Sequence, residues 1–106
     1  MSEIIELARF KVREGEEAAF LARRPAMLEA ARKHLPGLLR IELVKLDGGE
    51  WIDVVVWDSR EHAENAPAIA AGLPEFAAWM AHIAEDTAMD IGVVHDRAEA
   101  AAVAAR

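Results

Sequence analysis

The fold of this chain is decided by residues 38–58, which read LLRIELVKLDGGEWIDVVVWD. Two runs of mainly apolar residues, 38–46 and 51–58, flank the turn sequence Asp47-Gly48-Gly49. Such runs favour extended backbone, and an Asp-Gly step between them is typical of a tight turn. The stretch therefore predicts two antiparallel strands joined as a β-hairpin.

A strand and a helix are predicted before this hairpin. Residues 3–12, EIIELARFKV, have the β-branched and aromatic types of a strand. The glutamates on either side of Gly15 suit the first turn of a helix, where the helix dipole favours acids. This helix should run to about Leu35, with a kink at Pro25, and Pro36-Gly37 should end it.

A second helix and a last strand are predicted after the hairpin. Asp58 or Ser59 can cap the helix at its N-terminus. We expect Pro67 to interrupt it and Pro74 to restart it, because proline suits the first turn of a helix but not its interior. Residues 87–95, TAMDIGVVH, are expected to form the final strand.

The order of these elements predicts an α+β domain of ferredoxin-like βαββαβ topology with a four-stranded antiparallel sheet. Right-handed crossovers place both helices on one face of the sheet. The helix-free face keeps large apolar side chains, so we expect it to pack on a second copy as a homodimer, a dimeric α+β barrel. Residues 1–96 form this domain, and residues 97–106 form an Ala-rich C-terminal tail.

Composition excludes several classes of protein. Twelve Lys and Arg against nineteen Asp and Glu give a net charge of −7, which disfavours binding to nucleic acid or to an anionic membrane. The chain has no cysteine, which excludes disulfides and thiolate chemistry, and its four histidines lack the spacing of a metal site. With no apolar run long enough to span a membrane and no signal-peptide pattern, a cytoplasmic location is expected.

Three stretches give the chain a family resemblance: ARFKVREGEEAAF at 8–20, Pro36-Gly37 before LLRIEL, and VVVWDSREHAE at 54–64. In these stretches the chain resembles the antibiotic biosynthesis monooxygenase family of small dimeric α+β barrel proteins. The resemblance implies a cofactor-independent monooxygenase that acts on quinol-like or anthrone-like aromatic substrates. Two alternatives stay open: a non-catalytic dimer, either structural or holding a small hydrophobic or aromatic ligand, and an isomerase or cyclase on the same scaffold.

The resemblance also guides which positions could carry chemistry. Trp57 resembles a strand tryptophan of the haem-degrading branch, but that branch also uses an asparagine that aligns with Ala8 and a histidine that falls near Pro67. Haem is therefore not an expected substrate. The quinone-forming branch places an asparagine four residues before the tryptophan, where this chain has Asp53.

Candidate catalytic residues follow from the need for a base and a cation. A buried carboxylate at Asp53, or the imidazole of His62, could act as the base. Arg9 or Arg40 could stabilise a developing anion. The alternative interpretation is structural: Asp53 pairs with a neighbouring arginine, Arg9 and Arg40 pair with acidic residues at the dimer seam, and His62 is solvated.

Candidate substrate-binding residues are aromatic. Trp57 shares a strand face with Asp53, and Phe76 and Trp79 share a helical stripe with Met80 and Ile83. Trp57, Phe76 and Trp79 could wall a pocket for an aromatic ligand. The alternative is that all three are ordinary core residues.

Overall fold

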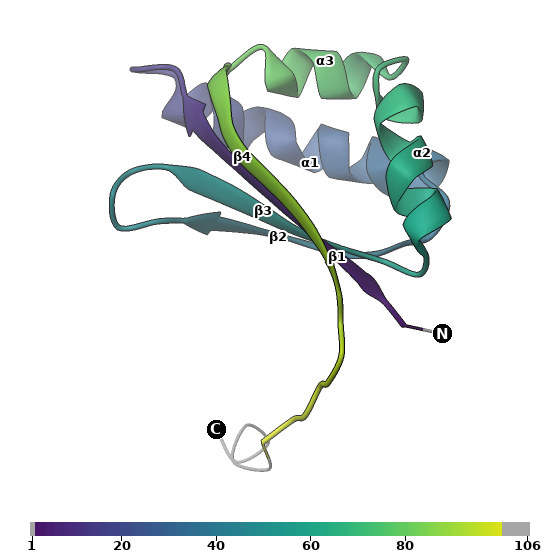
Figure 1. Ribbon diagram of the computed structural model, residues 1–106. Coiled ribbons are helices and arrows are strands. Elements are labelled where there is room, and N and C mark those ends of the chain that lie inside the picture. Colours follow the sequence, from purple (N-terminus) through teal and green to yellow (C-terminus); the bar gives the residue numbers. More distant parts are fainter. Residues whose placement is uncertain (1, 101–106) are drawn as a thin grey trace.

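The computed structural model describes residues 2–100 as a four-stranded antiparallel sheet with three helices on one side (Figure 1). The sheet order is β2-β3-β1-β4. The predicted ferredoxin-like topology is therefore confirmed. The elements are β1 (Ile4–Val12), α1 (Glu17–His34), β2 (Leu38–Lys45), β3 (Trp51–Trp57), α2 (Arg60–Ala70), α3 (Pro74–Met80) and β4 (Ile83–Val93).

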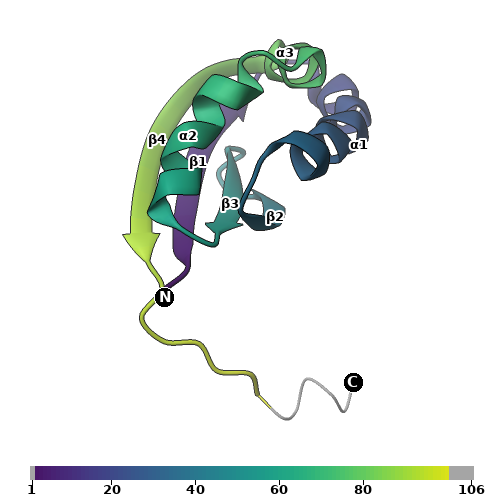
Figure 2. The same cartoon turned by 90° about the vertical axis from the view of Figure 1, so that its right-hand side faces the viewer.

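The sheet is curved, and the helices lie on its concave side (Figure 2). Beyond β4 the chain runs away from the sheet, and Arg97 pairs with Glu3 at 2.5 Å between Nη1 and Oε1. Residues 101–106 of the predicted tail lie outside the described residues. The division into a domain of 1–96 and a tail of 97–106 stays a prediction.

The turn between α1 and β2 shows why Gly37 is required. Its φ of +80° lies in the left-handed region that favours glycine. A Cβ at this position would also collide with the His62 ring and the Asp58 carboxylate. Asp58 donates its backbone N–H to the Gly37 carbonyl at 2.9 Å. This glycine thus lets the end of α1 approach the junction of β3 and α2.

The second helical segment corrects the sequence prediction in one respect. Pro67 lies inside α2, and the helix continues to Ala70 rather than breaking at the proline. The break comes at residues 71–73, because Pro74 pushes Leu73 into extended backbone with φ −100° and ψ 118°. Pro74 then occupies the first turn of α3.

The last strand also begins earlier than predicted. It starts at Ile83 rather than at residue 87, because Ile83 pairs with Val12 of β1. Ile83 therefore belongs to the sheet and not to the helical stripe in which its spacing placed it. Helix periodicity and strand pairing competed for this residue, and the long-range pairing prevailed.

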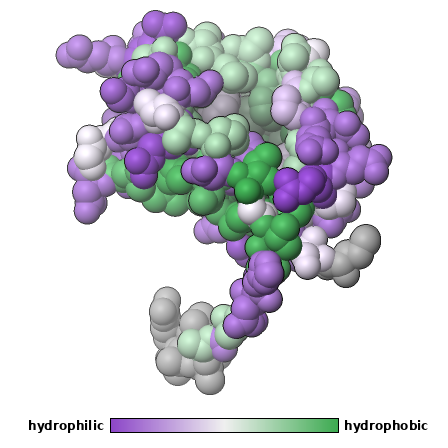
Figure 3. All heavy atoms as spheres, in the orientation of Figure 1, coloured by the Kyte–Doolittle hydropathy of each residue, from purple (hydrophilic) through white to green (hydrophobic). Residues whose placement is uncertain are grey.

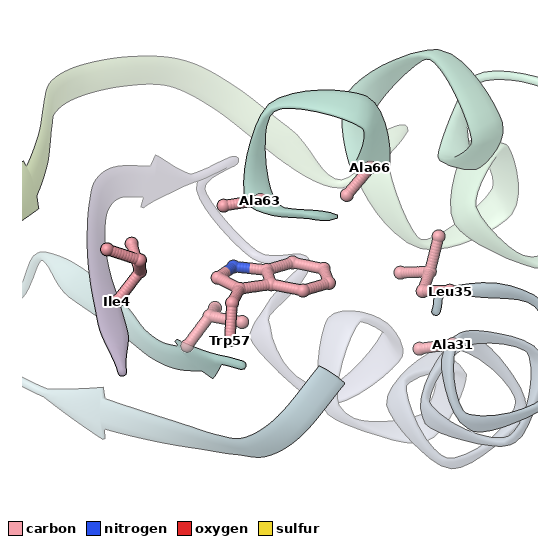
Figure 4. Packing of buried hydrophobic residues seen from close by; sticks show 7 residues of the cluster. Ile4, Ala31, Leu35, Trp57, Ala63 and Ala66 are labelled. Carbon is pink, nitrogen blue, oxygen red and sulfur yellow. The ribbon is translucent and has the colours of Figure 1, made fainter. Parts of the chain in front are cut away.

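The core consists of two clusters on the helix side of the sheet. In the first, Trp57 packs among apolar residues of the sheet, α1 and α2 (Figure 4). The second is aromatic, with Phe20 at its centre, 5.2 Å from Trp79 and 5.3 Å from Trp51 between ring centroids. The first cluster contains Ile4, Ala31, Leu35, Val55, Trp57, Ala63 and Ala66; the second contains Phe10, Phe20, Met27, Trp51 and Trp79.

Strand alternation separates the two faces of the sheet. Even-numbered residues of β1 and odd-numbered residues of β3 face the helices, and the register places Ala8 opposite Asp53. The opposite face of these two strands carries Ile5, Leu7, Arg9, Ile52 and Val54. No helix of the described residues is long and apolar enough to cross a membrane.

Candidate functional site

A cavity of about 420 Å³ lies between the sheet and the helices, and residues of all seven elements line it. Trp57 and Pro67 both belong to its wall. Most of the wall is apolar. The volume of the cavity falls within the range of small-molecule sites.

Glu6 is one of the acidic residues on this wall. Its Oε1 accepts a hydrogen bond from Trp57 Nε1 at 3.0 Å. Burial raises the pKa of Glu6; the Trp57 hydrogen bond lowers it, and the nearby charge of Asp53 raises it again, leaving the pKa above its ordinary value. A carboxylate whose pKa is raised is a stronger base than an ordinary one.

Asp53 also lines the cavity, but it is held in an ion pair. Arg24 Nη2 lies 2.5 Å from Oδ1, and Arg24 Nη1 donates to Oδ2 at 3.3 Å. Less than a tenth of either side chain is exposed. Burial raises the pKa of Asp53, and the hydrogen bonds and charge of Arg24 oppose that rise. The alternative interpretation, in which Asp53 pairs with an arginine, is therefore correct, and the partner is Arg24.

The structure does not bring the other predicted catalytic residues to the cavity. Arg9 is exposed on the helix-free face, and Arg40 pairs with Glu42 at 3.1 Å on an exposed surface. His62 Nδ1 lies 2.6 Å from Asp58 Oδ1, and no His62 atom lines the cavity. These three placements correct the sequence interpretation. We expected a charged residue within a strand to face the site. The alternation of side chains along β1 instead places Arg9 on the other face of the sheet.

The predicted aromatic residues do reach the cavity. Trp57, Phe76 and Trp79 all contribute to its wall. Trp57 and Trp79 are only 3% and 5% exposed, so they are core residues and cavity residues at once. The Arg24 guanidinium lies 5.3 Å from the centroid of the Trp79 ring, which links the buried ion pair to the aromatic wall. Their roles as substrate-binding residues stay predictions.

Two residues at the site were missed by the sequence analysis, and each had a detectable signal. Glu6 lies between Ile4 and Ala8 on the inward face of β1, where an unpaired charge is costly. Arg24 interrupts the buried stripe of α1 and is itself 7% exposed. A charged residue at an inward position of an otherwise apolar pattern is the signal that identifies both.

Known proteins resemble this chain in sequence family and in fold. The model of the antibiotic biosynthesis monooxygenase family matches residues 3–82. SnoaB, a cofactor-independent oxygenase from Streptomyces nogalater, has a TM-score of 0.64 and 20% identity over 93% of this chain and 97% of its own. A protein of unknown function from Nitrosomonas europaea has a TM-score of 0.70 and 16% identity over 95% of this chain and 97% of its own.

MupZ from Pseudomonas fluorescens has a TM-score of 0.69 and 20% identity over 86% of this chain and 68% of its own. At such identities the structural likeness shows a common fold and nothing more. No curated protein sequence matches the chain. The family model covers well over half of the chain, which therefore belongs to the antibiotic biosynthesis monooxygenase family.

Proposed function

We propose that the protein is a cofactor-independent oxygenase of electron-rich aromatic substrates of the quinol or anthrone type. One observation carries the proposal: Glu6, a half-buried carboxyl group with a raised pKa, is held by Trp57 in the wall of a largely apolar cavity. Membership of the monooxygenase family and the fold shared with SnoaB support the same class of reaction.

Glu6 acts as the base on the ring methylene of an anthrone. The carbanion gives one electron to dioxygen, and the two radicals combine to form a C–O bond. The distal peroxide oxygen then takes the proton back from Glu6. Removal of the second methylene proton forms the C=O bond, breaks the O–O bond and releases water. One oxygen atom enters the product, the other leaves as water, and the substrate supplies all the electrons.

The other wall residues orient the ring and shape the field around it. Trp57, Phe76 and Trp79 offer aromatic surfaces against which a planar substrate can pack. The Arg24–Asp53 pair fixes two opposite charges beside the base without water between them. Fixed groups of this kind stabilise developing charge more effectively than mobile solvent does.

Oxygen uptake on unsubstituted anthrone tests the proposal, after subtraction of the autoxidation measured without protein. We expect one dioxygen consumed per quinone formed and no product under argon. Glu6→Gln keeps the shape of the side chain and should lower kcat by about 10²–10⁴-fold, the usual effect of losing a base. Glu64→Gln, an exposed change on α2, is the matched control.

The rival functions give different results in this assay. Turnover of a related substrate that continues unchanged under argon would indicate an isomerase or cyclase. Saturable binding with no turnover in air would indicate a ligand-binding protein. Loss of activity in Glu64→Gln equal to that in Glu6→Gln would remove Glu6 from the role of base.

A homodimer through the helix-free sheet face is part of the same proposal. Proteins of this family are typically dimers. In the single chain Ile5, Leu7, Ile52 and Val54 are half-buried on that face. An apolar face of this kind gains free energy when a second copy covers it. Light scattering coupled to size exclusion should give twice the monomer mass at micromolar concentration.

A further inference from the structure

We infer that the cavity selects its ligand by charge: it accepts aromatic rings that are neutral or cationic and excludes rings that carry a carboxylate. Three acidic residues line the wall, Glu6, Asp53 and Asp86, and none of the described lining residues is Lys, Arg or His. The inference deepens the proposed function, on which it relies for the aromatic class of the ligand. The sign of the charge follows from the wall alone.

The buried arginine offsets one of these three acids, Asp53, and leaves Glu6 and Asp86. Arg24 lies behind Asp53 and places both Nη atoms on its two carboxylate oxygens. The pair is close to neutral as a unit, and Arg24 itself is not among the residues that line the cavity. A carboxylate on a ligand would therefore find no free cation on the described wall.

Asp86 sets the charge at the opening of the cavity. It is an exposed residue near the start of β4, opposite Phe10 of β1. Met80 and Met89 line the same cavity and are 49% and 59% exposed, so the wall is open to solvent on this side. Ile91 and Val93 of β4 are exposed as well, and apolar residues are visible on the face along which β4 runs (Figure 3). Asp86 thus lies on an exposed part of the wall, whereas Glu6 is half-buried.

The neighbouring cations point elsewhere. Lys11 pairs with Glu85 at 3.5 Å, and strand alternation puts this pair on the face opposite Asp86. Arg13 Nε donates to the Ala81 carbonyl at 3.0 Å. An apolar wall disfavours any charge, whatever its sign. Desolvation therefore weakens the binding of a cationic and of an anionic ligand alike. A difference between their affinities reports the effect of the acidic residues.

A series of matched probes tests the inference by calorimetry at pH 7: naphthylmethanol, naphthoate and naphthylmethylammonium. None of them is oxidised by dioxygen under these conditions, so binding is measured apart from turnover. We expect naphthoate to bind at least about tenfold more weakly than the other two, since one like charge at a partly dehydrated site has an effect of this order. Equal or tighter binding of naphthoate, or no binding of any probe, would overturn the inference.

Two variants assign the effect to the wall. Asp86→Asn, an exposed change, should strengthen naphthoate binding by about three- to tenfold and leave naphthylmethanol unchanged. Glu85→Gln removes the neighbouring carboxylate on the other face and should alter none of the three affinities. If both variants change naphthoate binding equally, overall charge and not the cavity wall is responsible, and the inference fails.

This result is independent of the assay for the proposed function. Oxygenation of anthrone together with tight naphthoate binding would reject charge selection and keep the oxygenase. Charge selection with no turnover of any aromatic would keep the inference and reject the oxygenase.

Discussion

Trp57 and Glu6 lie 51 residues apart in sequence, yet Trp57 Nε1 donates to Glu6 Oε1 at 3.0 Å across two adjacent strands. The register pairs Ile4 with Trp57 and Glu6 with Val55, so the indole lies diagonally from the carboxyl group on the same face. A donor in this position favours the charged form of the carboxylate, while burial favours the neutral form. The balance between them sets the proton affinity of the proposed base.

Trp57→Phe should move the pH dependence of activity to higher pH. The variant keeps an aromatic wall but loses the N–H that lowers the pKa of Glu6, so that pKa rises further. The acidic limb of kcat/KM against pH reports this change in the free enzyme. Trp51→Phe, in the other core cluster, should leave the limb in place. A limb that does not move in Trp57→Phe would show that Glu6 is not the group that titrates.

Glu6→Gln should gain stability relative to the parent as pH rises. Because the pKa of Glu6 is raised in the folded state above its ordinary value of 4.5, its contribution is complete below that value and is lost as pH rises through the folded pKa. Glutamine does not titrate and has no such loss. Urea unfolding from pH 4.5 to neutral pH measures the difference, and Glu64→Gln, the same substitution at an exposed position, is the control. A constant difference across that range would contradict the raised pKa.

Arg24→Met should destabilise the fold by about 3–5 kcal/mol, because it leaves the buried Asp53 carboxylate without its partner. Arg23→Met alters an exposed side chain one position away and should change stability by no more than about 0.5 kcal/mol. Adding Asp53→Leu to Arg24→Met should recover most of the loss, since an apolar pair of similar size needs no compensating charge. Chemical denaturation of these four proteins and of Asp53→Leu alone measures the losses. A loss in the double variant equal to the sum of the two single losses would mean that the two residues do not interact.

Leu7→Glu should convert the proposed dimer to a monomer. The change places a charge in the centre of the helix-free face, where it would be buried between the two copies. Leu21→Glu introduces the same residue on α1, where the leucine is 43% exposed, and should remain dimeric. Light scattering gives the mass of each. A parent protein that is itself monomeric at micromolar concentration would remove the dimer from the proposal.

Hemin should not bind stoichiometrically. Ala8 and Pro67 line the cavity where the haem-degrading branch is expected to have an asparagine and a histidine, and no described wall residue is a histidine to coordinate iron. Absorbance titration should show no saturable Soret shift. A one-to-one complex, followed by ring opening under a reductant, would assign the protein to the haem-degrading branch instead.

The sequence by itself determined the topology of this protein, because its signals are local. The Asp47-Gly48-Gly49 turn closes through Leu46 and Glu50, with Leu46 N–H donating to the Glu50 carbonyl at 2.7 Å. Pro36-Gly37 and Pro74 mark helix boundaries through backbone restrictions of single residues. Such signals act within a few positions of the chain, so reading the residues in order is enough to find them.

The tertiary structure alone decided which polar residues form the site. Arg24 and Asp53 are 29 residues apart, and their pairing depends on how α1 lies across the sheet. The strand and helix patterns place Asp53 and Arg24 at inward positions, but a pattern specifies a face and not a partner. The choice is made by register and helix packing, which are set by burial over the whole core rather than by any one stretch of sequence.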